Sequence, residues 1–155
     1  MPSKYECNEL FDNTTCKSET INNINGYRLT SNINGNSIFI PSTGHRQSGR
    51  TYNSEYINLW TNARADNYCC SGAQYMLASN KDKRINDTSR YAGMPIRAVL
   101  PIPKKSEDKF VDLGLPSKTL WATCNVGANS PEEYGNYYTW GDSENYDNNS
   151  SQQFT

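Results

Sequence analysis

The pattern of hydrophobic and polar positions predicts one short helix at the start of the chain. Ser3 and Glu6 have the spacing of a capping box, in which a hydroxyl and a carboxylate satisfy backbone amides at a helix start. We therefore expect a helix over residues 4–12, and the turn-forming residues 13–15 are expected to end it. The residues expected to supply its apolar contacts are Tyr5, Leu10, Phe11 and, as a further candidate, Cys7.

Beyond this helix, short runs of β-branched and aromatic residues alternate with Gly, Pro, Asn and Ser, a pattern typical of antiparallel strands. A hairpin is expected over residues 27–40 with its turn at 34–36, and the stretch 42–54 is expected to be a loop. Asn86-Asp87, in the polar run 80–89, is expected to form a turn, and Trp60 to anchor the core. Further strands are expected at 56–61, 74–78, 94–100, 110–116 and 119–126, with an aromatic strand or loop at 131–141. The expected class is α+β, mostly antiparallel β with a short N-terminal helix and long loops.

The composition fits a small core wrapped in polar, tyrosine-bearing loops. The chain has 155 residues, a length that suits one domain, with 35% hydrophobic and 12% aromatic residues. Residues 102–109 combine proline with charges and have no apolar face, as a semi-extended linker does. Residues 142–155 are rich in Asn, Ser and Gln, so we expect a disordered tail there.

Charge and hydropathy narrow the range of partners. The formal net charge is −1 with acids and bases interspersed, so nucleic acid is not an expected partner. No stretch has the roughly 18 apolar residues of a membrane span, and the first residues have no apolar signal-peptide core, so membrane insertion is not expected. The five cysteines lack a paired C-x-x-C spacing and are expected to be mostly free thiols. Cys69 and Cys70 could form a vicinal disulfide or pair elsewhere, and the sequence leaves this open.

The usual signatures of catalysis are missing from the sequence. No G-x-S-x-G, H-E-x-x-H or Walker loop occurs, and the single histidine, His45, has no catalytic partner near it in sequence. His45 is expected to have a structural or surface role. We therefore expect no catalytic residue, no metal site and no cofactor, and the protein is not expected to be an enzyme.

Two long motifs stand at opposite ends of the chain. Residues 112–128 read DLGLPSKTLWATCNVGA and residues 134–141 read YGNYYTWG. They resemble the opening of the Fibrobacter succinogenes major paralogous domain, a family abundant in Bacteroidetes. Residues 1–10 (MPSKYECNEL), 25–46 and 93–99 (GMPIRAV) resemble the second half of the same family. The two resemblances together cover most of the chain, but their order is swapped relative to the family.

The resemblance implies a C-type-lectin-like fold, which is related to formylglycine-generating-enzyme-type domains and to variable proteins of diversity-generating retroelements. It makes residues 1–101 a second half and residues 110–141 a first-half segment. The latter is either a permuted complement of residues 1–101 or the start of the next copy in a fragment of a tandem repeat. The family stretch that should hold the first helix is missing, which predicts uncovered apolar surface and either a marginally stable product or a segment-exchanged dimer. The Glu-Pro-Asn, Gln-Pro-Asp and Trp-Asn-Asp motifs of calcium-dependent lectins are absent.

The segment 61–91 is the expected binding region. Tyr, Asn and Arg recur there, and adaptable binding loops use these types because tyrosine gives large contact area at low entropy cost. In the retroelement variable proteins the corresponding late region carries the diversified residues. An ordinary solvated loop would have a similar composition. The candidate ligand-binding residues are Asn62, Arg64, Asp66, Asn67, Tyr68, Tyr75, Asn80, Lys83, Arg84, Asn86 and Tyr91.

These observations favour a non-enzymatic binding or adhesion module. Its ligand is expected to be a protein or glycan on a cell or phage surface, and the resemblance implies a parent protein at the cell surface or outside the cell. The alternative is a structural repeat of a bacterial surface protein that has no ligand of its own. Fold-level analogy alone does not decide between them, since one scaffold serves many functions.

Overall fold

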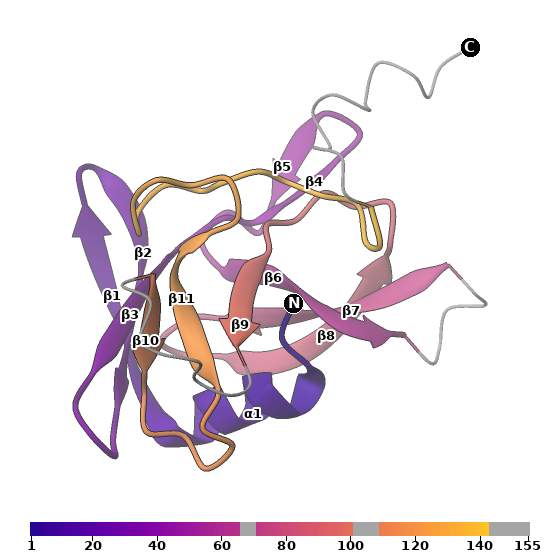
Figure 1. Ribbon diagram of the computed structural model, residues 1–155. Helices are drawn as coiled ribbons and strands as arrows, with labels where there is room; N and C mark the ends of the chain where they lie inside the picture. The colour runs from indigo at the N-terminus through magenta and orange to yellow at the C-terminus, as the bar shows by residue number, and fades with distance from the viewer. Residues whose placement is uncertain (66–70, 101–108, 143–155) are drawn as a thin grey trace.

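The computed structural model describes residues 1–65, 71–100 and 109–142 (Figure 1). Within them the chain forms one helix and eleven strands, and every paired strand runs antiparallel to its neighbour. The expected α+β class, mostly antiparallel β with a short helix, is therefore confirmed. The elements are α1 (Lys4–Asn13), β1 (Thr14–Ile21), β2 (Ile24–Ser31), β3 (Ser37–Pro41), β4 (His45–Gln47), β5 (Arg50–Tyr52), β6 (Ile57–Arg64), β7 (Gly72–Ala78), β8 (Lys83–Ser89), β9 (Arg97–Leu100), β10 (Phe110–Asp112) and β11 (Leu120–Asn125).

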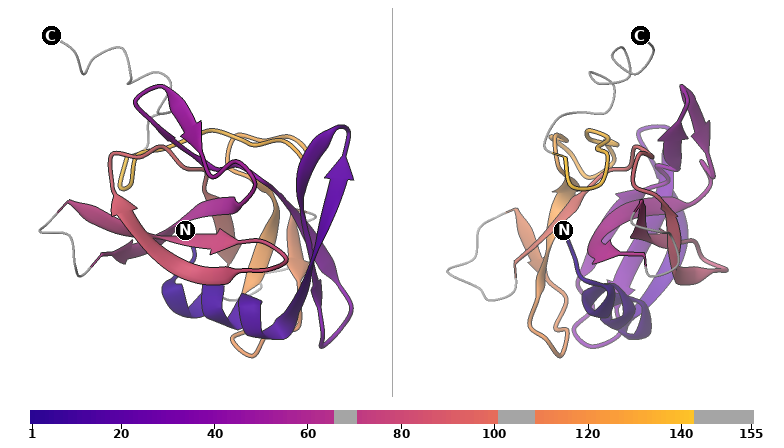
Figure 2. Two further views of the ribbon diagram at one scale, coloured as in Figure 1. Left: turned by 180° about the vertical axis from the view of Figure 1, so that it is seen from behind. Right: turned by 90° about the vertical axis from the view of Figure 1, so that its right-hand side faces the viewer.

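The capping box at the start of α1 is confirmed. The Ser3 hydroxyl accepts from the Glu6 amide at 3.2 Å, while the Glu6 carboxylate accepts from the Ser3 amide at 2.7 Å. Cys7, Leu10 and Phe11 are buried, but Tyr5 is 82% exposed, so the apolar contact expected of Tyr5 is wrong. Figure 2 shows α1 alongside β8, against which it packs.

The helix ends at Asn13, within the stretch 13–15 that was expected to end it, but Thr14 and Thr15 begin strand β1 and form no turn. β1 pairs with β2 along its whole length through a turn in which Asn22 and Asn23 have φ of 49° and 63°. Two positive φ values are the geometry of a type I′ turn, which matches the twist of a hairpin. β1 has the sequence TTCKSETI and is half exposed, so backbone pairing rather than an apolar stripe makes it a strand.

The expected hairpin over residues 27–40 is confirmed as β2 and β3. Its apolar side chains share one face with Cys7, Leu10 and Trp121 in the main core. Gly26 is required where β2 crosses β3, because a Cβ there would lie 2.6 Å from the Ile40 carbonyl oxygen. One face of the β1-β2-β3 sheet thus meets the main core, while Phe39 is buried on the other face beneath Arg28.

The second sheet has the order β6-β7-β8 and is covered on both faces. Trp60 is fully buried, as expected, and lies on the face opposite to the one that meets α1. The turn expected at Asn86-Asp87 is wrong, because both residues lie within β8, opposite Tyr75 and Gln74 of β7. β8 is an edge strand with partly exposed side chains, so its sequence can be polar. A polar sequence gives no strand signal, which is why a turn was expected there.

The loop expected at residues 42–54 contains a small hairpin, β4–β5, that projects at the top of Figure 1. Its turn has Ser48 and Gly49 at positive φ of 50° and 73°, again the type I′ pattern. Arg46 of β4 bridges to Gly93, which fixes the hairpin against the segment that follows β8. The expectation of an unstructured loop is therefore wrong for residues 45–47 and 50–52.

The third sheet has the order β10-β11-β9 and joins the two segments that flank residues 101–108 (Figure 1). All three strands are shorter than expected, and β9 begins only at Arg97 because Met94 and Ile96 bond to the loop segments at Tyr138 and Val126. Trp121 of β11 is fully buried in the main core. Residues on both sides of 101–108 therefore contribute to one hydrophobic core.

The aromatic segment 131–141 is a loop that covers the buried residues around Trp60, on the face of the β6-β7-β8 sheet opposite to α1. The Trp60 indole donates to the Tyr138 carbonyl at 2.7 Å, and the Trp140 indole donates to the Thr61 carbonyl at 2.7 Å. Met94 forms an isolated bridge to Tyr138. The expected linker at 102–109, apart from residue 109, and the expected disordered tail at 142–155, apart from residue 142, lie outside the described residues.

Candidate functional site

The structure spreads the candidate binding residues along the β6-β7-β8 sheet, with some at each end and Tyr75 and Asn86 at its middle. Arg64 pairs with Ala73, and Tyr91 follows β8 at the same end, where both side chains are exposed. Asn62 is exposed on β6 close to this end. Asn80 lies in the turn between β7 and β8, at the opposite end. Strands of seven residues separate the two ends by about 20 Å. Asp66, Asn67 and Tyr68 lie outside the described residues.

Two of the basic candidates are engaged within the chain. The Lys83 ammonium donates to the Phe11 carbonyl at 2.6 Å and to the Thr14 carbonyl at 3.3 Å. A cation at this position stabilises the C-terminal end of α1, where carbonyls carry partial negative charge. Arg84 forms an ion pair with Asp82 at 2.8 Å. These contacts give Lys83 a structural role and leave Arg84 at the exposed edge of the sheet.

Tyr75 and Asn86 are the candidates that the structure brings into direct contact. They lie opposite each other on β7 and β8, and the Asn86 amide donates to the Tyr75 hydroxyl at 2.9 Å. The ring of His45 tilts against Tyr75 with centroids 6.4 Å apart and stacks on Tyr52 with centroids 5.5 Å apart. Beneath them the Asn58 amide nitrogen is 3.3 Å from His45 Nδ1. We call these five residues the aromatic–amide cluster.

The cluster runs from a buried base to an exposed edge. Asn58 is fully buried and Tyr75 is 3% exposed, whereas Tyr52 is 44% exposed and His45 is half-buried. Burial lowers the pKa of His45, since a charged imidazole loses hydration there, so the ring is neutral near pH 7. Nδ1 then accepts from the Asn58 amide. Among the described residues the buried Asn58 Oδ1 has no hydrogen-bond partner, an arrangement that costs free energy unless a ligand or water supplies a donor.

His45, Tyr52 and Asn58 were not among the residues predicted from the sequence. They come from the stretch expected to be a loop and from β6, and the β4–β5 hairpin carries two of them to the sheet. The signal that could have found the hairpin is Ser48-Gly49, a turn pair between short runs that contain His45 and Tyr52. No pattern in the sequence relates these residues to Asn86, because only the sheet brings them together.

A cavity of about 500 Å³ is lined in part by Ser42 and Ser54, which lie on the chain segments that carry His45 and Tyr52. It opens where the β1–β2 hairpin extends beyond the core and faces the loop that precedes β6. This volume is within the range typical of small-molecule sites. The described residues that line it are Ser18, Glu19, Thr20, Asn25, Gly26, Tyr27, Ser42, Ser54 and Glu55.

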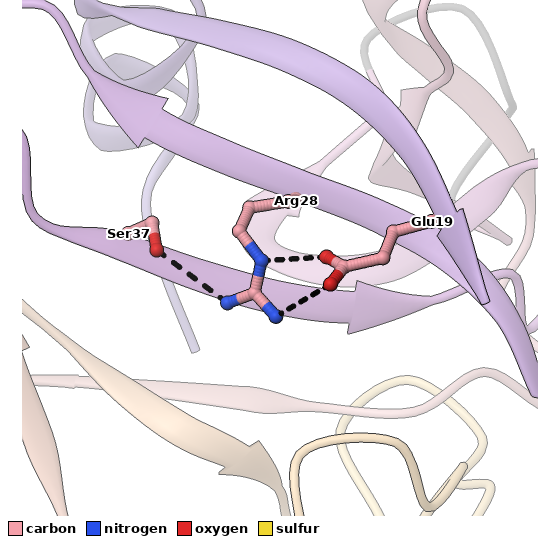
Figure 3. A network of polar contacts seen from close by, with 3 residues as sticks. All are labelled: Glu19, Arg28 and Ser37. Atoms are coloured by element: carbon pink, nitrogen blue, oxygen red, sulfur yellow. Dashed lines mark hydrogen bonds and ion pairs between the residues drawn. The ribbon is translucent and has the colours of Figure 1, made fainter. Parts of the chain in front are cut away.

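Figure 3 shows the ion pair between Glu19, which lines this cavity, and Arg28, which lines a second cavity of about 370 Å³. Arg28 Nε and Nη2 donate to the Glu19 carboxylate at 2.5 and 3.1 Å, and Nη1 lies 3.4 Å from the Ser37 hydroxyl. The Arg28 hydrogen bonds hold the pKa of Glu19 below its ordinary value. Arg28 also lies over the Phe39 ring at 5.7 Å, and Asn22 donates to Glu132 across the second cavity at 2.7 Å. The hydrogen bond between Asn22 and Glu132 thus spans the second cavity.

Three cysteines in the described part of the chain, Cys7, Cys16 and Cys124, are free thiols. Burial raises the pKa of Cys7 to about 12 and also raises that of Cys16, which disfavours the reactive thiolate. Cys69 and Cys70 lie outside the described residues. Across residues 1–65, 71–100 and 109–142 no three His, Cys, Asp or Glu side chains come together as metal ligands. No helix in the same ranges is long and apolar enough to span a membrane.

The aromatic–amide cluster provides ring faces for stacking and amide groups, and the neighbouring cavity provides hydroxyls and carboxylates. Most of these side chains are attached to strands or tight turns, so their positions are fixed before a ligand binds. This chemistry suits recognition of a ligand by hydrogen bonding and ring stacking. Comparison with known proteins adds no relative: the chain matches no family model, no curated protein and no solved structure.

Proposed function

We propose that this protein is a non-enzymatic ligand-binding or adhesion module that recognises a protein or glycan through the aromatic–amide cluster. The observation that carries the proposal is the sequence of ring contacts from exposed Tyr52 through His45 to buried Tyr75, with Asn86 at its edge. Exposed rings supported by a rigid sheet are the kind of anchor that dominates binding energy at interfaces. Asn86 adds a directional hydrogen-bonding group that gives such a surface specificity, while buried Asn58 supports the His45 ring from below.

The proposal includes a C-type-lectin-like fold in which residues 110–141 complement residues 1–101 within one chain. Support comes from the antiparallel pairing of β11 with β9 and from Trp121 in the main core. A permuted order of segments is compatible with a fold when the joined strands are neighbours, because the linker then has a short distance to span. On this proposal the module belongs at a cell or phage surface, where its ligand would be presented.

The test is capture of ligands on two arrays, one of bacterial and host glycans and one of displayed cell-surface proteins. The Tyr52→Ala and Asn86→Ala variants should lose capture of whatever the unaltered protein binds. Loss of a central aromatic anchor costs about 2 kcal/mol or more, which corresponds to an affinity about 30-fold lower. Tyr5→Ala is the matched control, because Tyr5 is an exposed tyrosine on α1 with no part in the cluster.

Capture that is retained by Tyr5→Ala and lost by Tyr52→Ala, with unchanged melting temperatures, would support the proposal. Equal capture by Tyr52→Ala, Asn86→Ala and the unaltered protein would overturn the assignment of the site. If the unaltered protein captured nothing on either array, the structural-repeat alternative would be favoured over ligand binding.

A further inference from the structure

The cavity beside the β1–β2 hairpin has a polar lining that is held in place by the fold. Its floor is formed by buried Tyr27 and Ser42, and its rim by exposed Thr20, Asn25 and Glu55. The Tyr27 hydroxyl donates to the Glu55 carbonyl at 2.8 Å, and the Thr20 hydroxyl donates to Asn25 Oδ1 at 2.8 Å. The Ser42 amide donates to the Asn25 carbonyl at 2.9 Å. A lining ordered in this way loses little conformational entropy when a ligand binds.

The lining favours a neutral polyhydroxylated ligand over an anion or an apolar molecule. Five hydroxyl-bearing residues and one amide accompany two carboxylates, and none of the described lining residues is Lys or Arg. An anion would meet Glu55 with no cation in the lining to offset it, since Arg28 is already paired with Glu19. An apolar ligand would bury these hydroxyls without partners, at a cost in free energy. Hydroxyl groups of a sugar can donate to the carboxylate and to the Thr20 oxygen, and they can accept from the serine hydroxyls.

The same two chain segments contribute residues to both the cavity and the aromatic–amide cluster. Ser42 lines the cavity and His45 belongs to the cluster, three residues apart, which places them at most about 10 Å from each other. In the second segment Ser54 lines the cavity and Tyr52 belongs to the cluster, and these residues are only two positions apart. A ligand longer than one sugar residue could therefore contact both.

We infer that the cavity is a sugar-binding subsite and that it and the aromatic–amide cluster hold adjacent residues of one oligosaccharide. The inference rests on the proposed function and narrows its ligand class from protein or glycan to glycan. The cavity holds one sugar through Thr20, Asn25 and Glu55, and the exposed face of Tyr52 supports the next.

The test uses the glycans that score highest on the glycan array, each prepared as an oligosaccharide and as its single sugar, in calorimetric titrations. The Thr20→Val and Glu55→Gln variants remove hydrogen-bonding groups at nearly constant shape. Each should weaken binding of the oligosaccharide about fivefold, the effect of losing one hydrogen bond. Thr15→Val is the matched control, since Thr15 lies on the same strand and its hydroxyl also donates to an asparagine, Asn32, at 2.8 Å.

Weaker binding in both cavity variants and in Tyr52→Ala, with Thr15→Val unchanged, supports the inference, as does tighter binding of the oligosaccharide than of its single sugar. Binding that depends on Tyr52 but not on Thr20 or Glu55 overturns the subsite and leaves the proposed function standing. Capture of proteins alone, with no glycan bound, overturns the inference in the same way. Glycan binding that none of these variants alters overturns both.

Discussion

Arg97 carries the clearest stability prediction, because its buried guanidinium joins three strands. Its Nε donates to Asn125 Oδ1 at 2.8 Å, Nη1 to the Ala122 carbonyl at 2.9 Å and Nη2 to the Phe39 carbonyl at 3.2 Å. The side chain is fully buried, and the register of β11 on β9 shifts beside it. Arg97 therefore connects β9, β11 and β3, and with them the two segments that flank residues 101–108.

The Arg97→Lys variant keeps the charge and most of the side-chain stem but replaces a planar fork by one nitrogen. A single ammonium cannot satisfy acceptors that face three different guanidinium nitrogens, so we expect two acceptors to lose their partner. Each unpaired buried acceptor costs about 1–3 kcal/mol, which gives a loss of roughly 2–6 kcal/mol in the free energy of unfolding. Burial lowers the pKa of Arg97 to about 9, so the group is charged at pH 7 in the unaltered protein.

Urea unfolding followed by tryptophan fluorescence and by circular dichroism measures this loss. With a slope of about 2 kcal/mol per molar urea, a loss of 3 kcal/mol lowers the midpoint by about 1.5 M. Arg50→Lys, at an exposed position on β5, is the control and should change stability by less than about 0.5 kcal/mol. If Arg97→Lys unfolds at the same urea concentration as Arg50→Lys, the three hydrogen bonds do not hold the segments together and the reasoning fails.

Three further predictions concern titration and the end of the helix. The pKa of Cys7 rises from 9.0 to about 12 on burial, so the folded state holds its proton longer and stability falls as pH rises above 9. Between pH 8 and 10 the free energy of unfolding, measured in urea melts, should fall by about 1.4 kcal/mol more in the unaltered protein than in Cys7→Ala. Identical pH profiles of the two proteins would contradict this. Burial lowers the pKa of His45 below 6.5, so its contribution is present above pH 6.5 and is lost as pH falls below it. His45→Gln should flatten that acid limb in thermal melts, and an unchanged limb would argue against a buried neutral ring. Lys83→Met should destabilise the protein by about 1 kcal/mol, because it removes the donor to the Phe11 carbonyl; Lys81→Met, at an exposed turn, should leave the melting temperature unchanged.

Features that depend on neighbouring residues could be predicted from the sequence. The capping box of Ser3 and Glu6 involves groups three residues apart, so its chemistry is visible without a fold. The β2–β3 hairpin has apolar residues on one face and a Gly-containing turn, and Trp60 is too large and apolar to remain outside a core. These local signals were sufficient for the α+β class.

The candidate site could be predicted only in part. Tyr75 and Asn86 were selected for their residue types, although Asn86 was expected in a turn and lies in a strand. Their contact depends on the register of β7 and β8, which backbone hydrogen bonds set between residues that carry no distinguishing pattern. His45 and Tyr52 reach the same place through a hairpin whose strands are three residues long.

The sequence by itself determined where the helix begins, which runs form the central strands and which large side chains enter the core. It did so because capping, turn geometry and apolar burial act over a few residues. Only the tertiary structure made strands of the polar segments β1 and β8, since their stability comes from pairing with a neighbour and not from their own side chains. It also placed the cavity and the aromatic–amide cluster on the same two chain segments, because the long-range packing of three sheets decides which surfaces meet.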